Sequence, residues 1–138
     1  MSVDGWAGGN GDWSNAANWY EGTPGPTTRW EITTPGVTVT LAAGESYSAG
    51  AGTVVAGAGL DVAGTLATSG ALTVDGVVVN SGTLDPTVSV AAGGYLNNQA
   101  GAQIVGNTGA YAQNGGPGVY LAAGGTLVNA GAITGGRR

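Results

Sequence analysis

Aliphatic residues recur at a spacing of six along most of the chain. Eight follow one another at this spacing and three more resume it after a break: Val54, Leu60, Leu66, Leu72, Val78, Leu84, Val90 and Leu96, then Leu121, Leu127 and Ile133. Glycine stands four residues after most of the first eight, at Gly64, Gly70, Gly76, Gly82 and Gly94. The repeat predicts a short strand with its aliphatic side chain inward, then a bend where glycine adopts a conformation closed to other residues.

The same spacing excludes the commoner arrangements of helices and strands. No window shows apolar residues at helical spacing without a glycine inside it, and each interior glycine costs about 1 kcal/mol relative to alanine. Strands six residues apart are also too close for ordinary hairpins. The pattern therefore predicts an all-β fold, a single-stranded parallel β-helix (β-solenoid) of about five coils, with roughly three repeats in each coil.

Two regions are expected along the chain. Residues 1–35 hold all the tryptophans (Trp6, Trp13, Trp19 and Trp30) and predict an N-terminal cap, which covers the strand edges and the core of the first coil. Residues 36–138 predict the solenoid body, with an insertion loop near 107–118 where Asn, Gly and Pro interrupt the repeat. The C-terminal coil shows no equivalent cap, from which we expect either that the natural protein continues or that this end stacks on another molecule.

Charge is scarce and excludes several partners. Of 138 residues 8% are charged, the net charge is −5, and the basic residues are Arg29, Arg137 and Arg138. Such a chain offers no cationic surface for nucleic acid or anionic lipid. It also lacks the run of about 20 apolar residues that membrane insertion by a helix requires.

Two segments carry a resemblance to a known class of proteins. WAGGNGDWSNAANW at 6–19 and GTLVNAGAITGG at 125–136 resemble the passenger regions of bacterial autotransporters and related secreted β-helical adhesins. The resemblance implies a structural or adhesive module displayed on the cell surface, either as a segment of a longer passenger or as a fibre subunit that stacks end to end. Its partners would be further copies of itself or a host or neighbouring cell.

Candidate chemistry is sparse. Histidine and cysteine are absent, which removes the commonest catalytic bases, nucleophiles and transition-metal ligands, so we expect no enzyme and no cofactor. The carboxylates of the body are Glu45, Asp61, Asp75 and Asp85. The segment GGNGD at 8–12 resembles one calcium-binding β-roll repeat but occurs once and is one residue short, so turn formation by its Asp and Asn side chains is favoured.

Two further surfaces are weighed against this structural interpretation. As an alternative, the tryptophans and Tyr20 could form an aromatic surface on which a glycan stacks, as in a carbohydrate-binding module. Their confinement to the expected cap favours burial instead. Thr53, Thr65 and Thr83 precede repeat aliphatics and suggest a row of hydroxyls, but other residue types interrupt it along the chain. Tyr111 and Tyr120 flank the insertion and are free to face a partner.

Overall fold

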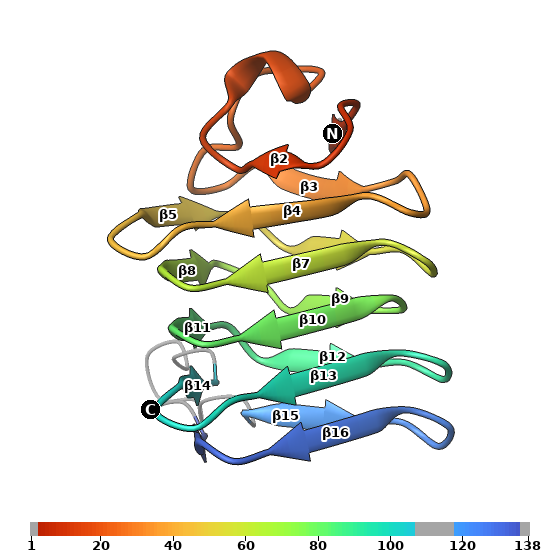
Figure 1. Ribbon diagram of the computed structural model, residues 1–138, viewed down its shortest axis with the longest axis vertical. Helices are drawn as coiled ribbons and strands as arrows, with labels where there is room; N and C mark the ends of the chain where they lie inside the picture. The colour runs from red at the N-terminus through yellow and green to blue at the C-terminus, as the bar shows by residue number, and fades with distance from the viewer. Residues whose placement is uncertain (1–2, 107–117, 136–138) are drawn as a thin grey trace.

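The computed structural model describes residues 3–106 and 118–135. Their strands form three parallel sheets, A, B and C, and from β3 onward the chain enters the sheets in this order, whereas the first circuit has strands in sheets A and B and none in sheet C (Figure 1). In Figure 1 the strands of sheet B lie nearest the viewer and point left, while those of sheet A point right behind them. Because the chain descends from its N-terminal end, it coils in the right-handed sense. The all-β, parallel solenoid predicted from the repeat is confirmed.

The strands are short. Sheet A contains β1 (Val3–Trp6), β3 (Arg29–Ile32), β6 (Gly52–Val54), β9 (Leu72–Val74), β12 (Val88–Val90) and β15 (Val119–Leu121). Sheet B contains β2 (Gly11–Asp12), β4 (Thr38–Leu41), β7 (Gly59–Val62), β10 (Val77–Asn80), β13 (Tyr95–Asn98) and β16 (Thr126–Asn129). Sheet C contains β5 (Ser46–Ala49), β8 (Thr65–Thr68), β11 (Thr83–Asp85), β14 (Gln103–Val105) and β17 (Ala132–Thr134). Within the described residues one 3-10 turn, η1 (Ala16–Asn18), interrupts the strands.

Inward side chains stack in columns from one circuit to the next. In sheet B the column runs through Val39, Leu60, Val78, Leu96 and Leu127. The first four are fully buried, because each has a neighbour above and below, whereas Leu127 at the end of the column is only partly buried. Each circuit thus completes the core of the circuit before it.

The six-residue spacing identifies residues that point inward, but it does not determine which of them stack on one another. In sheet A, Val54 pairs with Val74 and not with Leu72, while Leu72 pairs with Val88. Side chains alternate between the faces of a strand, so a shift of two residues keeps an aliphatic side chain inward. All eight residues from Val54 to Leu96 are therefore buried despite circuits of unequal length.

Sheet A extends into the region expected to be a separate cap. Strand β1 pairs residue by residue with β3, and β3 pairs with β6. The expected boundary at residue 35 therefore does not interrupt the sheets. The insertion expected near 107–118 lies outside the described residues, except for Gly118.

Residues 18–20 occupy the outer edge of β1. The Ala7 amide donates to the Asn18 carbonyl at 2.6 Å, and the Tyr20 amide donates to the Gly5 carbonyl at 2.9 Å. This short antiparallel pairing satisfies backbone groups that an edge strand would otherwise expose. The N-terminal edge of sheet A is consequently closed.

The repeat glycines serve a different purpose from the one expected. None of Gly64, Gly70, Gly76, Gly82 and Gly94 has a positive φ; the glycines that do are Gly22, Gly36, Gly44, Gly57, Gly93, Gly101 and Gly124. An added Cβ at most of the repeat glycines would instead meet backbone carbonyls of the preceding circuit. The expectation of a special backbone conformation is wrong, because close packing between circuits is what excludes a side chain.

Replacing Gly82 by alanine tests this explanation. The new Cβ would meet the carbonyl oxygens of Gly64 and Ala63, and backbone atoms cannot rotate away as a side chain does. We expect Gly82→Ala to lower the free energy of unfolding by about 1–3 kcal/mol, measured by urea denaturation. Gly9→Ala is the matched control, since Gly9 has open space around its Cβ position and no positive φ. Equal stability of the two variants would refute the explanation.

Candidate functional site

The four tryptophans form one buried cluster at the N-terminal end. Trp6, Trp13, Trp19 and Trp30 are at most 3% exposed. The ring of Trp13 lies 4.9 Å from that of Trp19 and 4.8 Å from that of Trp30, both in edge-to-face contact. Because other side chains and backbone cover these rings, a sugar ring has no indole face on which to stack.

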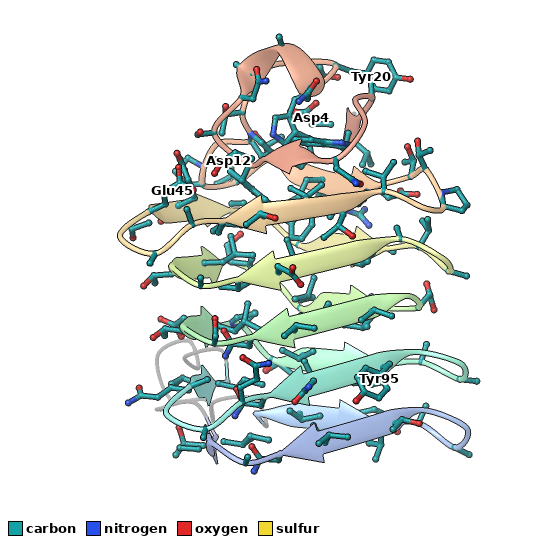
Figure 2. The ribbon with its side chains drawn as sticks, viewed as in Figure 1. Asp4, Asp12, Tyr20, Glu45 and Tyr95 are labelled. Atoms are coloured by element: carbon teal, nitrogen blue, oxygen red, sulfur yellow. The ribbon has the colours of Figure 1, made fainter. Side chains whose placement is uncertain are left out.

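Hydrogen bonds hold three of the four indoles in place. The Nε1 groups of Trp6, Trp19 and Trp30 each donate to a backbone carbonyl at 2.9 Å. The Nε1 of Trp13 is buried and has no acceptor. The aromatic ring left open to solvent at this end is that of Tyr20, 75% exposed, which projects away from the ribbon (Figure 2).

Asp4 is a buried carboxyl group beside this cluster. Its Oδ1 accepts the Glu21 amide at 2.9 Å, whereas its Oδ2 is buried without a partner. Burial raises the pKa of Asp4 above its ordinary value, and although the Glu21 amide opposes the rise, the Glu21 carboxylate adds to it. The ionised form of Asp4 is therefore unfavourable in the folded protein.

Asp4→Asn tests this pKa directly. With a folded pKa above the unfolded one, the contribution of Asp4 to stability is fully present below the unfolded pKa and is lost as pH rises through the folded pKa. The amide keeps the acceptor for Glu21 and cannot ionise. We expect the variant to be more stable than the wild type at pH 7 and equally stable at pH 3, by thermal unfolding. Asp61→Asn, at an exposed position, is the control; a gain that does not depend on pH would contradict the assignment.

Asp12 and Glu45 approach each other below the cluster (Figure 2). Burial acts to raise the pKa of Asp12, but hydrogen bonds from Ser14 and from the side chain of Glu45 outweigh it, so the pKa is lowered. The Asp12 Oδ1 accepts the amide and hydroxyl of Ser14 at 2.8 and 2.7 Å, and Glu45 accepts the Ala42 amide at 2.8 Å. These bonds are those of turn formation.

The remaining carboxylates of the body are not brought together. Asp61 lies on sheet B and Asp85 on sheet C, while Asp75 lies in the turn after β9. Within residues 3–106 and 118–135, no group of three or more acidic, His or Cys side chains could hold a metal ion.

Outward-facing hydroxyls are sorted by sheet. Thr53, Thr73 and Ser89 lie side by side on neighbouring strands of sheet A. Thr65 and Thr83 are neighbours on sheet C. Other residue types separate these hydroxyl residues along the sequence. They do not separate them in the sheets, because the intervening residues belong to other strands.

A small hollow opens on the outer face of sheet A near its N-terminal end. Its volume is about 150 Å³, and polar side chains of Arg29, Glu31, Thr53 and Thr73 contribute to its lining. Sites that enclose a small-molecule ligand usually measure about 300–1,000 Å³. The hollow is therefore too small to enclose such a ligand.

The C-terminal end presents the most exposed part of the core. In the last circuit Leu121 is 48% exposed, although its partner in the preceding circuit, Val90, is fully buried. Leu127 and Ile133 are likewise only partly buried. The final three residues of the repeat thus line an open end, and Tyr120 beside them is 63% exposed.

Sequence reasoning missed a ladder of asparagines that leads to this end. In sheet B the Asn80 Nδ2 donates to Asn98 Oδ1 at 2.9 Å, and the Asn98 Nδ2 donates to Asn129 Oδ1 at 2.9 Å. Each of the two amides also donates to a backbone carbonyl in the sheet C strand of the next circuit. Asn80 donates to the Gln103 carbonyl in β14, and Asn98 donates to the Ala132 carbonyl in β17. The signal available in the sequence was an Asn-x-Gly motif at Asn80 and Asn129, whereas Asn98 is followed by Gln99 and Ala100 and carries no such signal.

Replacing Asn98, the middle residue of the ladder, tests how much the ladder contributes to the stability of the fold. Asn98→Ala removes one of the two acceptors of the Asn80 amide and the side-chain donor to Asn129 Oδ1 and the Ala132 carbonyl, so we expect a loss of about 1–3 kcal/mol in unfolding free energy. Asn97→Ala removes the same side chain from the outer face of the same strand and should change stability by less than about 0.5 kcal/mol. The account fails if chemical denaturation gives both variants the same stability.

The segment that contains the last circuit is poor in charge until Arg137 and Arg138 at its end. Between Asp85 and Arg137 there is no charged residue, and all eight carboxylates precede residue 86. Natural proteins usually protect exposed strand edges with charged side chains or proline. The described strands of the last circuit, β15 to β17, have neither.

Comparisons with known proteins found no relative of this chain. No family model matches it, and neither the curated proteins nor the solved structures contain a match. In the part of the chain that the structure describes, no helix is long and apolar enough to cross a membrane. The resemblance to autotransporter passengers therefore stays a prediction.

Proposed function

We propose that this chain is a structural module of a secreted bacterial surface protein, a five-coil solenoid with a tryptophan-rich N-terminal cap that adheres through its last coil. The observation that carries the proposal is the half-exposed Leu121 at a position whose equivalent, Val90, is fully buried. An exposed apolar side chain at this position favours contact with another β-structure.

The composition of the open end supports adhesion by packing and backbone pairing. Its exposed side chains are those of Tyr120, Leu121 and Val128, and no charged residue belongs to β15, β16 or β17. A partner that offers strand edges can pair with such an end without desolvating charges. Resemblance of the flanking segments to autotransporter passengers supports the surface location.

The alternatives have less support. Catalysis would have to use carboxylates that lie on different faces, without histidine or cysteine. Glycan binding through the tryptophans would require indole faces that are buried.

Beads that carry the chain test adhesion. Attachment through the N-terminal end leaves the last circuit facing outward, and we expect these beads to bind one another or a layer of bacterial or host cells. Leu121→Lys on the beads should abolish the binding, because a lysine protects an exposed strand edge. Val77→Lys is the control, since Val77 is 43% exposed but lies in the middle of the solenoid. Beads that bind nothing would refute the proposed function.

A further inference from the structure

We propose that the hollow on the outer face of sheet A binds one acidic sugar residue of a glycan. The Arg29 guanidinium would hold the carboxylate of the sugar, and the polar side chains across the hollow would hold its hydroxyl groups. The inference goes beyond the proposed function, because the hollow lies on the side of the solenoid and includes no residue of β15, β16 or β17. Its support comes from the strand register, the size of the hollow and the chemistry of its side chains.

The register of three strands places the side chains that form the hollow. Trp30 of β3 pairs with Gly52 of β6, and Gly52 pairs with Leu72 of β9. These three residues are buried, so the residues on either side of each one point outward. The outward side chains therefore stand in two columns that cross the strands, Arg29–Ala51–Ala71 and Glu31–Thr53–Thr73.

Small side chains in the first column provide the space. Beyond Arg29 this column continues with Ala51 and Ala71, whose single methyl groups leave room that longer side chains would fill. Val3, which pairs with Arg29 and is 41% exposed, adds an apolar rim. The volume of the hollow is about 150 Å³. A cavity of about 150 Å³ binds benzene, so one six-membered ring fits a space of this size.

The polar side chains around the hollow are available to a ligand. Within the part of the chain that the structure describes, no hydrogen bond or ion pair engages the side chains of Arg29, Glu31, Thr53 and Thr73. Together they offer the five N–H donors of a guanidinium, a carboxylate acceptor and two hydroxyls that can donate or accept. A ligand that uses all of these groups carries both an anionic group and hydroxyl groups.

The two charged side chains orient such a ligand. Among the described residues Arg29 has the only cationic side chain, and its planar guanidinium matches a carboxylate with two parallel hydrogen bonds. Glu31 lies two residues further along β3, roughly 6.6 Å away between Cα atoms. Because Glu31 repels an anion and accepts from hydroxyl groups, it directs the carboxylate of the ligand to Arg29 and the hydroxyls to itself.

The two threonines distinguish a sugar from other small anions. Thr53 and Thr73 stand on neighbouring strands about 4.8 Å apart, in the same column as Glu31. A uronic acid carries a carboxylate and several hydroxyls on one ring and can contact all of these side chains. A free amino acid would pair with Arg29 and Glu31 but leave both threonines unused. Since the hollow lies on an outer face, the rest of a glycan can continue into solvent.

NMR titration of the isotope-labelled chain tests the ligand class. The probes are the methyl glycosides of glucuronic and galacturonic acid, the neutral methyl glucoside and galactoside, and acetate. We expect at least one acid to give saturable shifts of the Glu31, Thr53 and Thr73 amides. Its neutral counterpart lacks the carboxylate and acetate lacks the ring hydroxyls, so each should bind at least about tenfold more weakly.

Substitutions locate the binding in the hollow. Arg29→Gln should weaken binding of the acid at least about tenfold, and Thr53→Val, which replaces a hydroxyl by a methyl group of similar size, about threefold or more. Thr65→Val is the matched control, because Thr65 is a half-buried threonine on the outer face of sheet C, and it should leave the affinity unchanged. Circular dichroism checks that the variants are folded.

Four results would overturn the inference: no shift at the hollow with either acid, equal binding of an acid and its neutral counterpart, equal binding of acetate, or full affinity in Arg29→Gln. The outcome is separable from that of the proposed function. If the chain binds a sugar acid but coated beads adhere to nothing, the adhesive function is refuted and this inference stands. If beads adhere in a manner that Leu121→Lys abolishes but no acid binds, the reverse holds.

Discussion

The structure depends on the stacking of each circuit on the next. Backbone hydrogen bonds join the circuits, and the inward side chains of one circuit complete the core of its neighbour, as in the column from Val39 to Leu127. Stability in such a solenoid is nearly a sum of contacts between neighbouring circuits. An interior circuit has two neighbours, whereas a terminal one has a single neighbour, so the two ends need a separate solution.

The two ends of this chain differ for that reason. At the N-terminal end the chain doubles back, so that Tyr20 bonds the outer edge of β1 and large indoles occupy the space that another circuit would fill. At the C-terminal end the columns stop with Leu121 half exposed and the asparagine ladder stops at Asn129. The closed end holds the core of the molecule together, and the open end is the surface to which we attribute its function.

Much of the fold was predictable because short circuits place inward residues at a regular spacing in the sequence. The spacing of six identified inward residues such as Leu60 and Leu84, both fully buried. Ile104 was missed because it lies off that spacing, although it stacks between Leu84 and Ile133. The purpose of the repeat glycines and the ladder through Asn98 depend on contacts between circuits, which a pattern along one strand does not contain.

Hydrogen exchange by residue tests the central claim, that each circuit is stabilised by its neighbours. In the wild-type chain, amides of β4, β7 and β10 should exchange slowest, and those of β15, β16 and β17 fastest among the strands, with Leu127 faster than Thr126. This order follows because the Thr126 amide bonds the preceding circuit and the Leu127 amide faces the open side. Faster exchange in β3 and β4 than in β16 would contradict the account.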